Sequence, residues 1–119
     1  MSHVQQIKIA LGIAGVYTEQ SSWRGKNLKE GKGAQIDLLI ERSDYVTNIC
    51  EIKFSKSPFT ISKKYAEKLK NKIHAVQDNM KNKQTLFLTL ITTFGLVENQ
   101  YSISLVQNSI TMDALFADN

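Results

Sequence analysis

Two carboxylates and a lysine stand at strand-like spacing near the middle of the chain, where they could act together on one ligand. Residues Gly33–Ile40 carry Asp37, and residues Ile49–Phe54 carry Glu51 and Lys53, each within an alternating apolar pattern. Alternation with a period of two predicts a β-strand for each stretch. Because Glu51 and Lys53 are two residues apart, their side chains are expected on the same face of the second strand.

The polar stretch Arg42–Tyr45 between these strands is typical of a turn and predicts a hairpin centred near Asp44. Residues equidistant from that centre then face each other, so Asp37 is expected opposite Glu51. Facing carboxylates repel and weaken a sheet, and carboxylate oxygens are ligands that hard divalent cations prefer. A metal ion held by Asp37 and Glu51 is therefore predicted, with Lys53 beside it. The alternative is a surface ion-pair cluster in which Lys53 compensates the two acids.

Two elements are predicted before this hairpin. Apolar residues at helical spacing, with Ser2 as a cap, predict a first helix that ends near Gly12 and Gly15. Val16–Trp23 is rich in strand-forming residues and predicts a strand. The glycine- and lysine-rich residues from Arg24 to Gly33 are expected to form a flexible connection into the hairpin.

The sequence after the hairpin predicts a crossover and a short extension. Ser62 is expected to cap a long helix that ends near Met80. The apolar run Thr85–Thr93 predicts a strand buried on both faces, and a strand after a long helix suggests a parallel crossover. Tyr101–Val106 reads as a weaker strand, and Ile110–Phe116 as a short C-terminal helix. The expected fold is thus a mixed α/β sheet with a small strand-helix extension.

Length and composition indicate one soluble globular domain. The 119 residues are 42% hydrophobic and 22% charged, which is ordinary for such a domain.

No run of about 18 apolar residues exists, so no membrane span is expected. The start lacks a basic region followed by an apolar one, so no secretory signal is expected and the cytoplasm is the expected location. The single cysteine, Cys50, is expected to be a buried free thiol.

Positive charge is concentrated in one part of the chain. The formal net charge is +4, yet the segment Lys53–Lys83 carries nine lysines against Glu67 and Asp78. A local basic surface suits a polyanionic partner. The alternative is a solvated helix face with no partner.

An Asp on one strand and Glu-x-Lys on the next, within this order of elements, resembles the PD-(D/E)XK nuclease superfamily. The longer sequence pattern of residues 33–40 and 50–54, followed by Thr60–Lys63, is similar to that of the C-terminal nuclease-like domain of AAA-type ATPases common in Bacteroidetes. The similarity extends to residues 91–96 and 113–116. It implies a restriction-endonuclease-like αβββαβ core, a mixed sheet flanked by helices, for residues 1–119. It also implies that this single domain is a fragment whose upstream ATPase domain is absent.

The resemblance implies a nuclease that hydrolyses phosphodiester bonds with Mg²⁺ or Mn²⁺. Asp37 and Glu51 would hold the metal ion, and the carbonyl of Ile52 would be a further ligand. Lys53 would complete the catalytic set by orienting or deprotonating a metal-bound water. The sequence departs from the pattern in two places: Ile36 stands where the name-giving proline would precede Asp37, and the expected first helix has no acidic residue.

The same resemblance implies partners. Lys63 and Lys64, at the start of the long helix, are expected to bind the nucleic-acid backbone. DNA is the expected nucleic acid, the upstream ATPase domain is the expected partner in cis, and a homodimer is an open expectation.

Two other classes of function remain open at the level of sequence. The domain could be a non-catalytic module that keeps the nuclease fold and docks nucleic acid or protein for its ATPase. It could also be an interaction domain that self-associates through an exposed edge strand at Tyr101–Val106.

Overall fold

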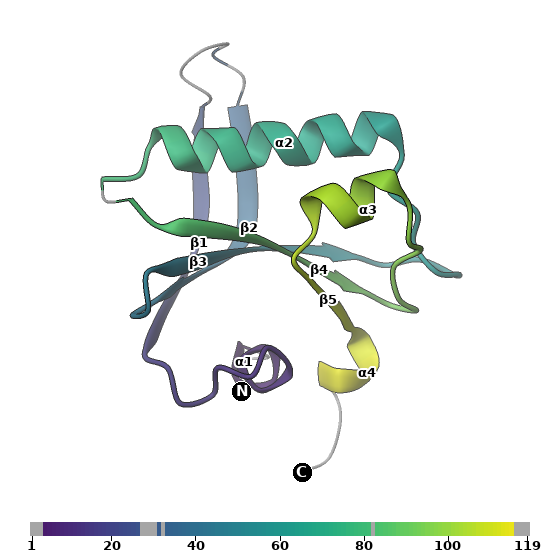
Figure 1. The fold of residues 1–119 in the computed structure, drawn as a ribbon, viewed down its shortest axis with the longest axis horizontal. Coiled ribbons are helices and arrows are strands. Elements are labelled where there is room, and N and C mark those ends of the chain that lie inside the picture. The colour runs from purple at the N-terminus through teal and green to yellow at the C-terminus, as the bar shows by residue number, and fades with distance from the viewer. Residues whose placement is uncertain (1–3, 27–30, 32, 82, 116–119) are drawn as a thin grey trace.

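A five-stranded mixed β-sheet with helices on both faces forms the α/β fold of this chain (Figure 1). The structure is a computed structural model and describes residues 4–26, 31, 33–81 and 83–115. Its elements are α1 (Val4–Ala10), β1 (Thr18–Lys26), β2 (Gly33–Arg42), β3 (Val46–Lys53), α2 (Lys63–Asp78), β4 (Thr85–Thr92), α3 (Gln100–Leu105), β5 (Asn108–Thr111) and α4 (Met112–Leu115). The order of the first six elements is the predicted αβββαβ order.

The strands lie side by side in chain order, from β1 to β5. The pairs β1–β2 and β2–β3 are antiparallel, whereas β3–β4 and β4–β5 are parallel. The segment from β3 through α2 to β4 is therefore the predicted parallel crossover. Figure 1 shows α2 and α3 on one face of the sheet and α1 and α4 on the other.

A separate apolar core lies on each face of the sheet. The α2-face core joins strand residues Ile36, Leu39 and Ile49 to Leu69 and Val76 of α2. The α1-face core joins Ile7 of α1 to its strand partners, which are Ile40, Cys50, Ile91 and Ile110. Because β3 and β4 contribute to both cores, their apolar residues are continuous rather than alternating, as a strand covered on both faces requires.

The long helix α2 begins where the sequence predicts. Ser62 is its N-cap, and the Ser62 hydroxyl accepts a hydrogen bond from the Tyr65 backbone N–H at 3.1 Å. This bond satisfies one of the free N–H groups of the first turn. The helix ends at Asp78, two residues before the predicted end at Met80.

Three predicted segments differ from the structure. Ile110, expected in the C-terminal helix, belongs to β5, and α4 begins only at Met112; Phe116 lies outside the described residues. Arg24, Gly25 and Lys26 belong to β1 rather than to a flexible connection, because they pair with Gln35, Ala34 and Gly33; residues 27–30 and 32 of that connection lie outside the described residues.

The predicted strand Tyr101–Val106 is also wrong, because these residues form α3 and its C-cap. Asn99 accepts hydrogen bonds from the backbone N–H groups of Tyr101 and Ser102, and Ser102 bonds back to Asn99. This capping box outweighs the strand preference of the apolar residues. Self-association through a strand at Tyr101–Val106 is thereby ruled out, and the edge strands of the sheet are β1 and β5.

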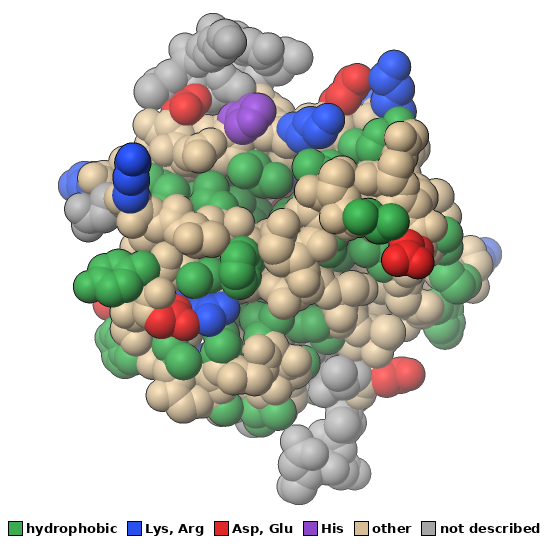
Figure 2. All heavy atoms as spheres, viewed as in Figure 1, with side chains coloured by type: hydrophobic (Ala, Val, Ile, Leu, Met, Phe, Trp, Pro, Cys, Tyr) green, Lys and Arg blue, Asp and Glu red, His purple; other side chains and the backbone are tan. Residues whose placement is uncertain are grey.

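No helix among the described residues combines the length and the apolar character that crossing a membrane requires. On the face of the molecule shown in Figure 2, acidic and basic side chains are interspersed and form no large patch of one sign. Large apolar side chains that are exposed come from several elements, with Phe54, Tyr45 and Tyr17 the most exposed at 81%, 77% and 70%.

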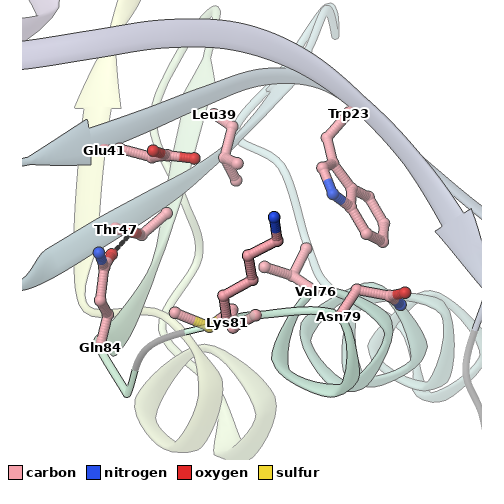
Figure 3. Close-up of a pocket in the computed structure, with 9 residues that line it drawn as sticks. Trp23, Leu39, Glu41, Thr47, Val76, Asn79, Lys81 and Gln84 are labelled. Carbon is pink, nitrogen blue, oxygen red and sulfur yellow. Dashed lines mark hydrogen bonds between the residues drawn. The ribbon is translucent and has the colours of Figure 1, made fainter.

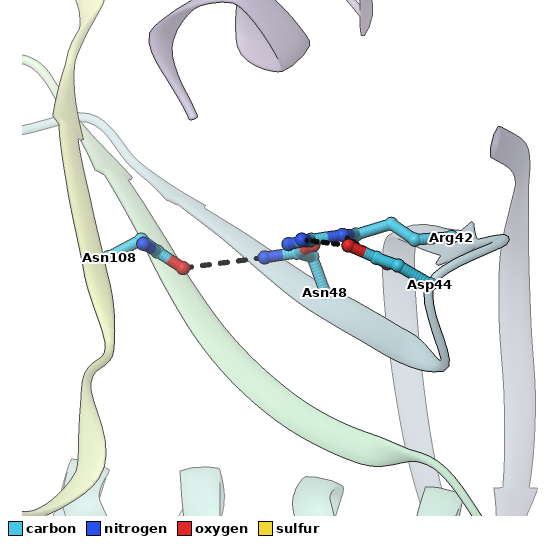
Figure 4. A network of polar contacts seen from close by, with 4 residues as sticks. All are labelled: Arg42, Asp44, Asn48 and Asn108. Atoms are coloured by element: carbon cyan, nitrogen blue, oxygen red, sulfur yellow. Dashed lines mark hydrogen bonds and ion pairs between the residues drawn. The ribbon is translucent and has the colours of Figure 1, made fainter. Parts of the chain in front are cut away.

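A row of hydrogen-bonded polar side chains crosses the sheet on the side of the α1-face core (Figure 4). Arg42 of β2 binds Asp44 through two hydrogen bonds, of 2.6 and 2.9 Å, and its third bond reaches the amide oxygen of Asn48. The Asn48 amide nitrogen then donates to Thr89 of β4 at 3.0 Å and to Asn108 of β5 at 3.4 Å. Asn48 is fully buried, so these bonds fix the register of four strands at once.

We expect Asn48→Ala to lower the free energy of unfolding by about 2–4 kcal/mol. The reason is that it removes three hydrogen bonds and leaves buried partners unsatisfied. Asp44→Asn is the matched control: it keeps an amide oxygen that can accept from Arg42, so the loss should stay below about 1 kcal/mol. Urea unfolding followed by circular dichroism measures both. Equal losses for the two variants would contradict a structural role for the buried hydrogen bonds of Asn48.

Candidate functional site

The β2–β3 hairpin has the register that the sequence predicts. Leu38 faces Cys50, Ile40 faces Asn48 and Glu41 faces Thr47, so the centre of the hairpin is Asp44. Pairing between β2 and β3 ends at the Leu38–Cys50 pair. Asp37 and Glu51 occupy the next position along this register, where β2 and β3 stop pairing. The two acids predicted to share a site therefore lie at the open end of a hairpin.

A β-bulge in β2 contains Asp37. Ile36 pairs with Trp23 of β1 and Leu39 pairs with Ser21, so Asp37 and Leu38 together stand opposite the single residue Ser22. The strict alternation predicted for residues 33–40 is therefore wrong, because the bulge places Ile36 on a different face from Leu38 and Ile40. Ile36 lies in the α2-face core, while Leu38 and Ile40 lie with the α1-face core. Bulges bend a strand and redirect its side chains, and they occur often beside active sites.

The two acids have different surroundings. Asp37 is exposed, and its carboxylate makes no hydrogen bond or ion pair with any described residue. Glu51 is only 7% exposed, and its carboxylate accepts a hydrogen bond from the ammonium of Lys72 at 2.5 Å. Lys72 belongs to α2, so this ion pair ties the helix to the sheet. One acid is thus free to bind a ligand, and the other is already neutralised.

Lys53 lies on the same face as Glu51, as predicted, but it contacts an aromatic ring. Its ammonium is 4.4 Å from the centre of the Tyr65 ring, which is a cation–π distance. The Tyr65 ring in turn packs edge-on against Phe59, with centroids 5.5 Å apart. The lysine that compensates Glu51 is therefore Lys72, and Lys53 has no ion-pair partner among the described residues.

The Tyr65 hydroxyl is buried and has no hydrogen-bond partner among the described residues. Burial and, secondarily, the nearby charge of Glu51 raise the pKa of Tyr65 above its ordinary value. The hydroxyl therefore stays protonated and can donate a hydrogen bond to an incoming anion or water. A buried donor without a partner calls for an explanation, such as a bound water, ion or ligand at this position.

The backbone of β3 presents a carbonyl to the same end of the hairpin. The carbonyl of Lys53 accepts a hydrogen bond from the Thr93 N–H, so it points toward β4. Successive carbonyls of a strand point to opposite edges, so the carbonyl of Ile52 points toward β2. The β2–β3 ladder ends before Ile52, which leaves this oxygen available as a ligand beside Asp37.

A groove with a volume of about 580 Å³ runs between α2 and the start of β2. Lys64, Lys68 and Lys72 line it, together with Gly33, Glu67 and Asn71. The three lysines recur every fourth residue, which sets them about 6 Å apart along the helix axis. Lys72 also pairs with Glu51, so the row of lysines leads to the acidic pair. Of the two predicted backbone-binding lysines, Lys64 lines this groove, and Lys63 lies at the first position of α2 outside it.

The donor set fits a hard divalent cation in kind. Two carboxylates and one carbonyl oxygen are the ligands that Mg²⁺ and Mn²⁺ prefer, and water commonly fills the remaining positions. No group of three or more His, Cys, Asp or Glu side chains in the described part of the chain could hold a metal ion. Any metal here would thus rest on Asp37, Glu51 and a backbone oxygen, with Lys72 displaced from Glu51.

Sequence reasoning missed two residues of this site, Lys72 and Tyr65. Both lie on the apolar stripe of α2, where Tyr65, Leu69, Lys72 and Val76 follow one another at helical spacing. A charged residue inside a buried stripe needs a partner of opposite charge. That signal points to Lys72 and would have indicated a buried acid on the sheet.

Comparisons with known proteins give a similar fold and no function. No protein-family model matches the sequence, and neither does any curated protein. The crystal structure of AF1548, a protein of unknown function, is similar with a TM-score of 0.59 and 16% sequence identity. The match covers 95% of this chain and 64% of AF1548, so the chain spans less than two thirds of that protein's length. A likeness at this level of identity establishes the shared fold alone.

We expect Lys72→Met to lower the free energy of unfolding by about 2–4 kcal/mol, because it leaves the buried carboxylate of Glu51 without a counter-charge. Adding Glu51→Gln to this variant should recover most of the loss, since the uncompensated charge is then gone. Lys70→Met, on the exposed side of the same helix, is the matched control and should change stability by less than about 0.5 kcal/mol. Urea unfolding of the wild type, Lys72→Met, Glu51→Gln and the double variant gives the coupling energy. A loss for Lys72→Met that Glu51→Gln does not relieve would contradict the ion pair.

The thiol of Cys50, beside Glu51, predicts a loss of stability in alkali. Burial, with a smaller effect from the charge of Glu51, raises the pKa of Cys50 from 9.0 to about 12. A raised pKa means that the folded protein keeps a proton that the unfolded chain releases. This contribution to stability is complete below about pH 9 and is lost as the pH rises toward about 12.

We therefore expect Cys50→Ala to be less stable at neutral pH, because of the lost packing, but to lose stability less steeply above about pH 9. Urea midpoints for the two proteins between about pH 7 and 11 test this. Parallel curves would show that the thiol does not contribute to the alkaline decline.

Proposed function

We propose that this domain is a Mg²⁺-dependent phosphodiesterase of the PD-(D/E)XK type that cleaves nucleic acid, with DNA as the expected substrate. The observation that carries the proposal is the open end of the β2–β3 hairpin. There Asp37, a bulge residue whose side chain is exposed, occupies the position across from Glu51 in the hairpin register. Lys53 and the Ile52 carbonyl come from the same end of β3. The likeness to AF1548 supports the fold and is silent on this activity.

Asp37, Glu51 and the Ile52 carbonyl would hold the metal ion. When bound, Mg²⁺ or Mn²⁺ would polarise the scissile phosphate and lower the pKa of a coordinated water. Lys72 would hold the Glu51 carboxylate in position before substrate binds, and its ammonium could then turn to the phosphate. Lys53, held over the Tyr65 ring, would offset the charge that builds on the phosphoryl oxygens and orient the attacking water. The Tyr65 hydroxyl, which remains protonated, would donate to a phosphate oxygen.

The lysine groove would hold the nucleic-acid backbone on its way to the acids. Lys64, Lys68 and Lys72 line the groove, and Lys63 stands at the start of the same helix. Ammonium groups along a helix bind phosphates without reading bases, so this contribution should be strongly salt-dependent and independent of sequence. As part of the same proposal, the domain works in the cytoplasm, receives its substrate from an upstream ATPase domain in cis, and cuts both strands of a duplex as a homodimer.

A non-catalytic docking module is the second candidate, and the Glu51–Lys72 ion pair favours it. A buried carboxylate already neutralised at 2.5 Å by a lysine of α2 has a structural explanation that needs no metal. Such a domain would keep the lysine groove and bind nucleic acid for its ATPase without cutting it.

We expect the domain to cleave a mixed panel of single- and double-stranded DNA and RNA in Mg²⁺ or Mn²⁺ and to lose this activity in EDTA. Asp37→Asn should lower the rate at least about 100-fold while nucleic-acid binding stays within about threefold, because the variant removes a metal ligand and not a lysine. Glu98→Gln, an exposed acid far along the chain, is the matched control and should cleave as the wild type does. Gel-based cleavage and anisotropy binding measure the two quantities.

Binding without cleavage by the wild type, unaffected by Asp37→Asn, would establish the docking module instead. Neither binding nor cleavage would overturn both candidates.

A further inference from the structure

A second pocket lies at the opposite end of α2 from the start of the lysine groove, and the proposed nuclease chemistry does not use it. Its volume is about 300 Å³, and Figure 3 shows the side chains around it. It opens between the C-terminal end of α2 and strands β1, β2 and β3. None of its lining residues belongs to the acidic site or to the lysine groove.

An indole ring held in place forms one wall of this pocket. Trp23 pairs with Ile36 in the β1–β2 ladder and packs against the α2-face core. Its ring lies across Gly25, two residues along the same strand: a Cβ at Gly25 would come within 2.4 Å of the ring. A glycine is therefore required beneath this indole. Since Gly25 and the core fix the ring, its orientation exists before any ligand binds.

The other walls combine an apolar base with polar groups that have unused hydrogen-bonding capacity. Leu39 and Val76, each 3% exposed, form the apolar part. Figure 3 shows the Lys81 side chain between Glu41 on one side and Trp23 on the other, with the ring nitrogen of Trp23 turned toward the lysine. Among the described residues, neither the Lys81 ammonium nor the Glu41 carboxylate has an ion-pair partner.

Two hydrogen bonds hold the rim of the pocket in place. The Thr47 hydroxyl of β3 donates a hydrogen bond to the amide oxygen of Gln84, and the Thr85 N–H donates to the Tyr45 carbonyl at 3.0 Å. These bonds anchor to the sheet the segment that follows α2. The amide nitrogen of Gln84 is left as a further donor at the rim. The polar groups of the pocket are thus one carboxylate acceptor and several donors around a flat aromatic wall.

We propose that this pocket binds an unpaired guanine base. Aromatic walls bind bases by stacking, because every base has a flat π-face. A carboxylate is the acceptor that suits the two neighbouring N–H donors on the Watson–Crick edge of guanine, and a lysine is the usual donor to its O6 and N7 acceptors. Glu41 and Lys81 supply these two groups. Adenine presents only one donor on that edge, so the carboxylate gains less from it.

Two sources share this chemistry, a free guanine nucleotide and a guanine in a single strand. The proposal does not depend on the proposed nuclease activity, because it involves no metal and none of the residues Asp37, Glu51 or Lys53. If both proposals hold, a base in this pocket would be anchored one helix length, about 24 Å, from the start of α2.

Trp23 is the single tryptophan of the chain, so its fluorescence reports on the proposed stack directly. We expect GMP, titrated in EDTA, to quench this fluorescence to saturation. AMP should bind more weakly, and ribose 5-phosphate should not quench at all. A short single-stranded oligonucleotide with one guanine identifies the source: tighter binding than GMP assigns the pocket to a nucleic-acid strand, and weaker binding assigns it to a free nucleotide.

Variants of exposed residues test the polar contacts without threatening the fold. Lys81→Met should weaken GMP binding about tenfold, the effect of losing one charge-assisted hydrogen bond. Lys83→Met, two residues away and outside the pocket lining, is the matched control and should bind GMP as the wild type does. Glu41→Gln should reduce the preference for GMP over AMP. Asp37→Asn should leave GMP binding unchanged, which separates this proposal from the metal site.

Three results would overturn the proposal. The first is the absence of saturable quenching by GMP. The second is equal quenching by ribose 5-phosphate, which would indicate a phosphate site on the surface lysines. The third is an equal loss in Lys81→Met and Lys83→Met, which would indicate non-specific attraction to positive charge.

Discussion

The carboxylate of Glu51 is the charge around which this fold is arranged. It lies on a central strand, beneath the longest helix, and is 7% exposed. A buried charge of this kind is tolerated only with a close partner, and Lys72 supplies one at 2.5 Å. The position and rotation of α2 on the sheet must therefore satisfy this pair as well as the apolar contacts of Leu69 and Val76. The lysine groove and the Trp23 pocket both depend on that placement, because α2 forms a wall of each.

Replacing such a pair with apolar residues commonly leaves stability unchanged or raises it, so stability alone gives no reason to keep it. The neighbours of the pair suggest what it serves. Asp37 has no partner among the described residues, the Tyr65 hydroxyl is buried without one, and the Ile52 carbonyl points to the unpaired edge of β3. A structural ion pair would be expected to come with satisfied neighbours. The buried Tyr65 hydroxyl without a partner and the exposed carboxylate of Asp37, both near a neutralised acid, point to a site that is completed by something else.

The sequence predicts much of this arrangement because the governing signals are local. The hairpin register follows from a polar turn centred on Asp44, and the start of α2 follows from Ser62. The bulge at Asp37 is not predictable in this way: it arises from pairing with β1, a partner that alternation within β2 does not reveal. Helix α3 was missed for a different reason. Its apolar residues favour a strand, and the two hydrogen bonds of the Asn99–Ser102 capping box decide the matter instead.

The residues of the candidate site also fall into two groups, those that the sequence predicts and those that it does not. The acids and Lys53 are close in sequence and share one hairpin, so their proximity could be inferred from spacing. Lys72 and Tyr65 come from a helix that follows later, and their contact with Glu51 and Lys53 depends on how α2 crosses the sheet. That crossing is set by the packing of the α2-face core, which spacing alone does not determine.

Charge geometry distinguishes the two candidate functions in physical terms. A docking module needs only positive charge facing the phosphates, and Lys64 and Lys68 provide it without any acid. The exposed carboxylate of Asp37 at the end of a basic groove repels a polyanion at the point where the backbone would pass, because Glu51 is already neutralised by Lys72. That repulsion weakens a pure binding surface, whereas a metal ion between the acids would reverse its sign and hold the phosphate there. The exposed carboxylate of Asp37 is unfavourable for docking and useful for metal-dependent hydrolysis, and this asymmetry is the physical reason for placing the nuclease first.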